Sequence, residues 1–138
     1  MVRSAKVRGV IAAAALAMSC GGSSGSSGTS STTSPTGTCT TSATTTTIVI
    51  QAGGAVCPAA ITVSRGAQVT FVNQDTRGHD MFSDPHPEHN DCPEVNSVGH
   101  LEPGQSRQTS NMVIARKCGF HDHELPDNRN LQGSITIQ

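Results

Sequence analysis

The part of the chain that most restricts the fold runs from about residue 47 to the end, where short alternating segments are separated by turns. The segment TTTTIVIQ is rich in Thr and Ile, and ITVSRGAQVTFVN holds two alternating runs around Arg65-Gly66. Short alternating runs of β-branched and aromatic residues are typical of strands. No stretch combines a sustained helical period with capping residues, so we expect an all-β sandwich.

The N-terminal part of the chain has a different composition. Residues 1–20 place three basic residues before a short apolar run that ends at Cys20, which is typical of a secretory signal peptide. The end of this run resembles a bacterial lipobox, which implies a lipid on Cys20 and a membrane-anchored lipoprotein facing the periplasm or the cell surface. Replacing Cys20 with Ser would then release the protein from membranes. Ordinary signal cleavage, with Cys20 unmodified, is the alternative.

The next segment, residues 21–46, consists almost entirely of Gly, Ser and Thr. Such a composition cannot bury enough apolar surface to offset the entropy lost on ordering. We therefore expect a disordered linker here and a single folded domain over residues 47–138.

The charge of the chain excludes one class of partner. The formal net charge is -1 with neutral histidines, and no cluster of Lys and Arg follows the signal peptide. A nucleic-acid-binding surface needs such a cluster. We expect no nucleic-acid partner.

Histidine is unevenly distributed. All 6 histidines lie between His79 and His123, most of them in the windows HDMFSDPHPEH and CGFHDH. Histidine is the most common metal ligand, and imidazole suits copper and zinc. Cys118, His121 and His123 combine a thiol with imidazoles, and together with the distant His79 they can place nitrogen and sulfur around one ion. A thiolate with two imidazoles is the ligand set of blue copper sites, although the same atoms also bind zinc.

Several separated pieces of the chain resemble the cupredoxin family, in a consistent order. ITVSRGAQVTFVNQDTRGHD is similar to the strand, Gly turn and Asn-ending strand that lead to the first copper histidine. LEPGQS resembles the Pro-Gly turn before the last hairpin, and KCGFHDH followed by LQGSITIQ resembles the closing Cys, His, axial residue, Gly and final strand. The resemblance covers about residues 61–138 and implies a Greek-key β-sandwich that binds one copper ion.

Carried over to this sequence, the resemblance implies that His79 is the upstream imidazole ligand and Cys118 the thiolate ligand. The third ligand is His121 by plastocyanin-like spacing or His123 by azurin-like spacing, and we favour His121. The position of the usual axial methionine holds Leu131, which has no donor atom. Either the site has three ligands or Glu124 supplies an axial carboxylate, because the loop before Leu131 is long.

A second departure is the insertion-like stretch SDPHPEHNDCPEVN, which several prolines make stiff and irregular. We expect His86 and His89 to decorate a solvated loop here, with a second, looser metal contact as the alternative.

The cysteines leave two outcomes open, because thiols in an exported protein pair unless something else holds them. A disulfide of Cys39 with Cys57, or of Cys57 with Cys92, is compatible with a Cys118 thiolate ligand. A Cys92–Cys118 disulfide would instead remove that ligand and leave a sandwich without blue copper.

The function that the resemblance implies is one-electron transfer by a single copper ion that alternates between Cu(I) and Cu(II), with an unidentified redox partner and no catalysis by this chain. The first alternative is a periplasmic copper-handling module that uses the same histidines to sequester or deliver copper without fast redox cycling. Two further alternatives are a copper enzyme and a purely structural sandwich with surface histidines.

Overall fold

A computed structural model describes Cys39 and residues 42–138 of the chain. The expected signal peptide, the lipidation site Cys20 and most of the expected linker lie outside the described residues. Within the described part, no helix has the length and apolar character needed to cross a membrane.

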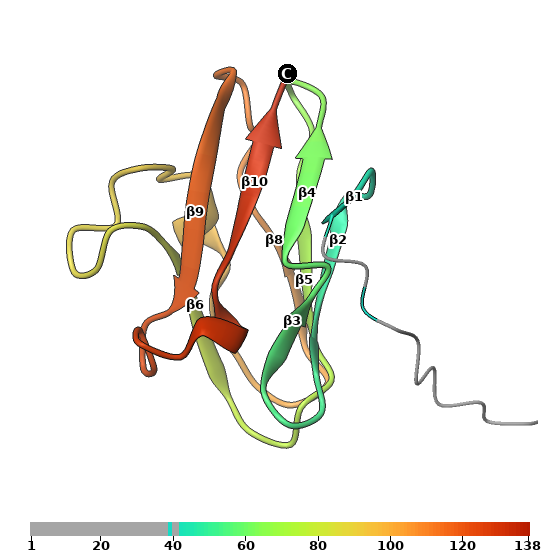
Figure 1. Cartoon of the computed structure of the whole chain (residues 1–138), viewed down its shortest axis with the longest axis vertical. Coiled ribbons are helices and arrows are strands. Elements are labelled where there is room, and N and C mark those ends of the chain that lie inside the picture. Colours follow the sequence, from blue (N-terminus) through green and yellow to red (C-terminus); the bar gives the residue numbers. More distant parts are fainter. Residues whose placement is uncertain (1–38, 40–41) are drawn as a thin grey trace, which may run out of the picture. The chain divides into compact units, whose positions relative to one another are not determined.

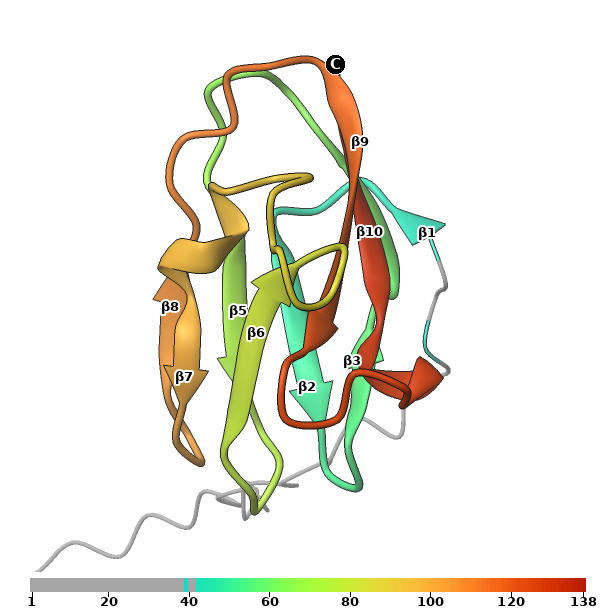
Figure 2. The same ribbon diagram turned by 90° about the vertical axis from the view of Figure 1, so that its left-hand side faces the viewer.

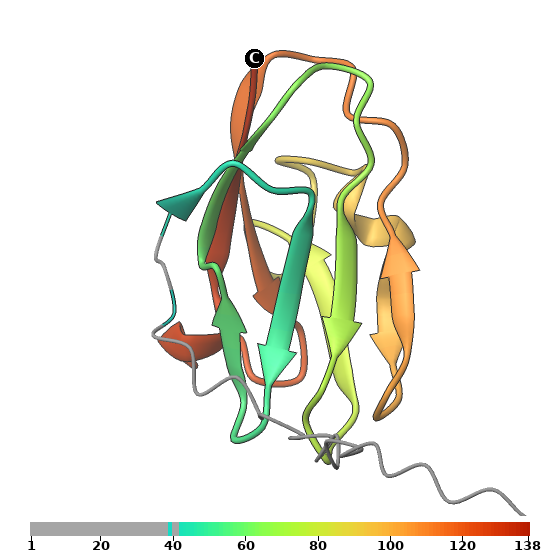
Figure 3. The same cartoon turned by 90° about the vertical axis from the view of Figure 1, so that its right-hand side faces the viewer.

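The described residues form two β-sheets (Figures 1 and 3). The first sheet contains, in spatial order, β1 (Ser42–Ala43), β4 (Ala60–Val63), β10 (Gly133–Ile137), β9 (Arg116–Asp122), β6 (His79–Ser83) and β7 (Gly99–Leu101). The second contains β3 (Ala55–Cys57), β2 (Thr47–Gln51), β5 (Thr70–Asn73) and β8 (Ser106–Gln108). Short 3-10 helices, η1 (Val95–Ser97) and η2 (Arg129–Leu131), lie in the connections.

The alternation seen in the sequence determines what each strand buries. In β2, Ile48 and Ile50 are buried while their neighbours are only partly covered. The rings of Phe71 in β5 and Phe120 in β9 meet edge to face with centroids 5.2 Å apart, so they join the two sheets across the core. Each fully buried side chain of this size contributes about 1.5–3 kcal/mol of transfer free energy. The expectation of an all-β sandwich is confirmed.

The connections place β9 in the middle of the first sheet. It pairs antiparallel with β10 on one side and with β6 on the other. The pairing with β6 sets Phe82 opposite His121 and Ser83 opposite Phe120. This register brings the end of β6 next to the histidine-rich end of β9.

The folded domain begins earlier than the expected boundary at residue 47. Ser42 and Ala43 form β1, which pairs in parallel with Ala60 and Ile61 of β4. A disulfide also joins Cys39 to Cys57 at the end of β3. Composition indicated a linker here, but backbone pairing to a sheet edge and a covalent bond hold these residues in the fold.

A second disulfide joins Cys92, in the long connection between β6 and η1, to Cys118 in β9. Both residues are fully buried. The bond closes a sequence separation of 26 residues, which corresponds to about 3.5 kcal/mol in the chain-entropy view of disulfide stabilisation. In this structure Cys118 is therefore not the thiolate ligand that we expected, because its sulfur is bonded to Cys92.

The two disulfides lead to a direct prediction. Alkylation of the unreduced protein followed by peptide mapping should find the pairs Cys39–Cys57 and Cys92–Cys118 and no alkylated Cys118. Reduced protein, alkylated after treatment with a thiol reagent, is the control that shows each cysteine to be reactive when free. An alkylated Cys118 in the unreduced sample would contradict this connectivity.

Candidate metal centre

The side chains of β9 alternate between the two faces of the first sheet. Phe120 points into the sandwich, where it contacts Phe71 of the other sheet. Cys118 and Asp122 share its face, since every second side chain of a strand points to the same side. His121 lies on the opposite, outer face of the sheet.

Strand β6 is divided in the same way. His79, Met81 and Ser83 are buried on the inner side. Phe82 is the register partner of His121 and points outward, as does Asp84 just after the strand. The ends of β6 and β9 therefore present one set of side chains to the interior and another to the outer face.

Four histidines gather on the outer face. His86 and His89 come from the loop after β6, which Figure 2 shows in yellow in front of β6 and β9, while His121 and His123 come from the end of β9. One ring nitrogen from each of the four lies within 4.8 Å of the others. Opposite nitrogens bound to one ion at about 2 Å lie about 4 Å apart, so the rings need only a small inward movement to share a metal.

The position and the tautomer of His121 are fixed by a carboxylate. Nδ1 of His121 lies 2.7 Å from Oδ1 of Asp84. A carboxylate only accepts hydrogen bonds, so this contact assigns the ring proton to Nδ1 and leaves the lone pair on Nε2. Nε2 is buried and has no hydrogen-bond partner among the described residues. A buried imidazole nitrogen with a free lone pair can bind a metal ion. Histidines that bind metals usually donate their other ring N–H to a carboxylate, a backbone carbonyl or water, as His121 does to Asp84.

His89 and His123 face each other. Nδ1 of His123 lies 3.1 Å from Nε2 of His89. The ring of Phe82 packs beneath both, with centroids 4.7 Å from His89 and 5.5 Å from His123. Without a metal the two nitrogens share a proton. Both of these nitrogens can bind a metal only if the proton between them moves away, for example to the other nitrogen of the same ring, because a ligating nitrogen must offer its lone pair.

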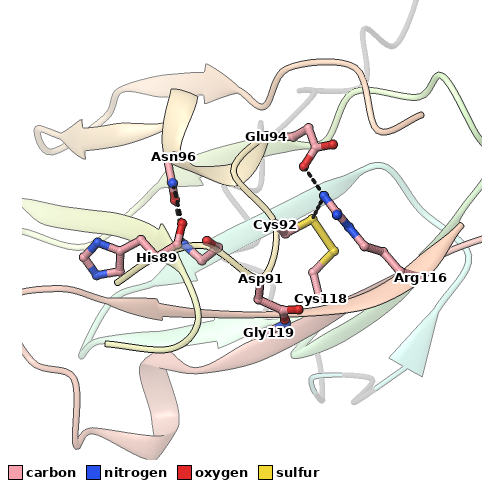
Figure 4. The surroundings of a disulfide bond; sticks show 9 residues. His89, Asp91, Cys92, Glu94, Asn96, Arg116, Cys118 and Gly119 are labelled. Carbon is pink, nitrogen blue, oxygen red and sulfur yellow. Dashed lines mark hydrogen bonds and ion pairs between the residues drawn. A yellow bond between two sulfur atoms is a disulfide. The ribbon is translucent and has the colours of Figure 1, made fainter. Parts of the chain in front are cut away.

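The loop that carries His89 is held in one conformation. His89 has a left-handed backbone with φ of 50°, which is uncommon for a residue with a side chain. Its carbonyl accepts a hydrogen bond of 2.8 Å from the side chain of Asn96 (Figure 4). The side-chain oxygen of Asn96 in turn accepts a hydrogen bond from the backbone N–H of Ser83. Asn96 thus ties the His89 backbone to the end of β6.

The base of the same loop is fixed to β9 around Gly119. The backbone N–H of Gly119 donates to Asp91, and its carbonyl accepts from the backbone of Asp84. The Cys92–Cys118 disulfide follows directly, as Figure 4 shows. A Cβ on Gly119 would overlap a carboxylate oxygen of Asp84. Only glycine therefore lets Asp84 approach β9 closely enough to hold His121.

Electrostatics within the cluster favour the neutral form of His89. Burial lowers the pKa of His89, and the charges that His121, His123 and His86 carry when protonated lower it further, against a small opposing effect of Asp80. Four adjacent imidazoles repel one another as cations. The cluster is therefore better suited to binding a cation than to binding protons.

His79 lies elsewhere. Its ring is buried on the inner side of the sheet, with Nδ1 2.8 Å from Oδ2 of Asp122 and Nε2 3.1 Å from Oδ2 of Asp75. Both nitrogens that could bind a metal already contact carboxylates.

The structure therefore brings together a different set of residues from the expected one. His121 and His123 join His86 and His89, whereas His79 and the bonded Cys118 belong to the opposite face. The candidates for an axial ligand are also outside the cluster. Leu131 is buried in the core, and Glu124 is exposed, with its backbone bonded to Asp122.

We expected His86 and His89 to decorate a loop, whereas the structure places them next to His121 and His123; the sequence did not point to Asp84 or Asn96. The spacing itself held a signal. Residues 118 and 121 are an odd number of positions apart, so a strand that continues through both must point them to opposite faces.

No protein-family model matches the sequence, and no curated protein matches it. Solved structures do match. A purple cupredoxin from Nitrosopumilus maritimus is 18% identical with a TM-score of 0.52, over 67% of this chain and 98% of that one. Oxidised plastocyanin from Dryopteris crassirhizoma is 20% identical with a TM-score of 0.52, over 67% and 99%.

A third similar structure is a copper-containing nitrite reductase from Thermus scotoductus SA-01, which is 19% identical with a TM-score of 0.51. The match covers 67% of this chain but only 22% of the reductase. At these identities the comparisons concern the fold alone, and they agree with the strand arrangement described above. The folded part of this chain has a cupredoxin-like β-sandwich fold.

Proposed function

We propose that the domain binds one copper ion through His86, His89, His121 and His123. The observation that carries this proposal is the buried Nε2 of His121, which has no partner among the described residues while Asp84 holds the other ring nitrogen. A buried polar atom without a partner is costly unless something binds it. The other three rings place their nitrogens around the same point.

Copper is the metal that this donor set favours. Nitrogen sites bind Cu(II) more tightly than the other first-row divalent ions, including zinc, in the Irving–Williams order. The cupredoxin-like fold also supports copper, because the similar structures include a reductase described as copper-containing. The ligands proposed here are nonetheless imidazoles only, since the sulfur of Cys118 is in a disulfide.

The function that we propose for the bound ion is one-electron transfer. Copper supplies a one-electron redox couple, between Cu(I) and Cu(II). The protein would keep the ligands in place during the exchange, because Asp84 orients His121, Asn96 fixes the His89 backbone, and the disulfide closes the loop base. His86 is the exposed member of the cluster, so its ring is the route by which an electron would reach a partner.

Copper handling is the second candidate, and a specific observation favours it. A site without a thiolate lacks the soft ligand that best stabilises Cu(I). Two of its ligands also lie on an exposed, proline-rich loop from which an ion can leave.

We predict that His121→Ala and His89→Ala each reduce Cu(II) affinity by more than about 100-fold, because each removes a ligand from the cluster. Asp84→Asn should reduce it by about 10- to 100-fold, because an amide oxygen accepts the hydrogen bond from Nδ1 of His121 more weakly than a carboxylate and carries no negative charge. His100→Ala is the matched control, since His100 is an exposed histidine outside the cluster, with its Nε2 near Glu102. Isothermal titration of the purified protein measures all four. Wild-type affinity in His121→Ala would exclude the proposed site.

The two candidate functions differ in the fate of the ion after reduction. For electron transfer we expect the copper-loaded protein to be reduced by one electron and reoxidised repeatedly, with its copper retained through gel filtration. For copper handling we expect Cu(I) to leave the protein and appear in a competing chelator. Release of all copper after a single reduction would contradict the electron-transfer proposal.

A further inference from the structure

The structure contains a second group of titratable side chains, which the metal cluster does not use. Asp75, His79 and Asp122 form a buried chain of contacts on the inner side of the first sheet. Their exposed fractions are 7%, 1% and 1%. Burying two carboxylates beside one imidazole is costly unless each group is fully hydrogen-bonded.

One end of this chain reaches the ligand-bearing backbone. While Oδ2 of Asp122 contacts His79, its Oδ1 accepts hydrogen bonds from the backbone N–H groups of Asp80, at 3.2 Å, and Glu124, at 3.1 Å. The backbone N–H of His123 in turn donates to the carbonyl of Asp80 at 2.7 Å. The Asp122 side chain therefore joins the backbone just after His123 to Asp80 of β6, the residue whose carbonyl accepts from the His123 N–H.

The other end is anchored in the connections of the second sheet. Oδ1 of Asp75 accepts from the backbone N–H groups of Gly53 and Thr76, and these bonds lower the pKa of the Asp75 carboxyl although burial opposes them. The backbone of Asp75 donates to the side chain of Asn73, at the end of β5. His79 is thus the link between an anchored turn and the residue that lies between His121 and His123.

We propose that His79 is a positioning residue for the metal cluster, which acts from the opposite face of the sheet by fixing Asp122 and, through it, the backbone that carries His121 and His123. This inference rests on the proposed metal site. The position of His79 in the sequence suggested a metal ligand. In the structure its ring contacts the carboxylates of Asp122 and Asp75, on the face of the sheet opposite to the cluster. The role that the contacts give it is to hold a ligand segment in place.

The test compares His79→Gln, which presents one nitrogen in place of two, with Asp75→Asn, which keeps His79 but weakens its anchor. Val63→Ala is the control, since Val63 is buried in β4, outside this chain of contacts. All variants are made in the full-length protein. The first readout needs no metal: amide hydrogen exchange at Asp80 and Glu124, followed by NMR.

We expect His79→Gln to accelerate exchange at both amides by at least about tenfold relative to the rest of β9, with a smaller effect of the same sign in Asp75→Asn. With Cu(II), His79→Gln should still bind one ion, about tenfold more weakly and with a changed electron paramagnetic resonance spectrum. Val63→Ala should keep the wild-type spectrum despite its lower stability.

Wild-type exchange at Asp80 and Glu124 together with a wild-type Cu(II) spectrum in His79→Gln would overturn the inference. Complete loss of the bound ion in a folded His79→Gln would also overturn it, because His79 would then be a ligand. If His79→Gln does not fold, Asp75→Asn decides by the same readouts. If the wild-type protein binds no copper, the proposed function fails, while the exchange measurement still decides whether His79 positions this backbone.

Discussion

The Cys92–Cys118 disulfide is the constraint on which the arrangement of the candidate site depends. It fixes the sulfur of Cys118 on the inner side of the first sheet and ties the end of the histidine-bearing loop to β9. The ion pair of Arg116 with Glu94 lies beside it and adds a contact between the same two segments (Figure 4). A loop that would otherwise sample many conformations is thereby closed at its base, so His86 and His89 stay near the end of β9.

The sheet then separates two kinds of polar chemistry that are close in sequence. Along β9, Asp122 points inward to His79, whereas His121 points outward to Asp84. The inner group is fully hydrogen-bonded and joins the two sheets. The outer group has four adjacent imidazoles, and one of their nitrogens has no partner among the residues that the structure describes, which suits the cation that we propose. The hydrogen bonds of Asp122 on the inner face thus hold the backbone that carries His121 and His123 on the outer face.

The sequence predicted the fold well because a sandwich is a consequence of local alternation, visible in β2 and in the segment that forms β4 and β5. The sequence did not predict which histidines lie together, because that depends on long-range geometry. Whether Cys118 binds a metal or another cysteine depends on where Cys92 lies after a loop rich in proline. The inclusion of Cys39 in the domain likewise depends on a bond to Cys57, which a Gly, Ser and Thr composition does not reveal.

In the site that we propose, the metal ligands are imidazoles of the outer face and no thiolate takes part. X-ray absorption at the copper edge of the Cu(II)-loaded protein measures this directly, because sulfur and nitrogen neighbours scatter differently and lie at different distances. We expect a first shell of nitrogen scatterers only, with the outer-ring signals of imidazole. A sulfur neighbour in the first shell would contradict the account and would return Cys118 to the ligand set.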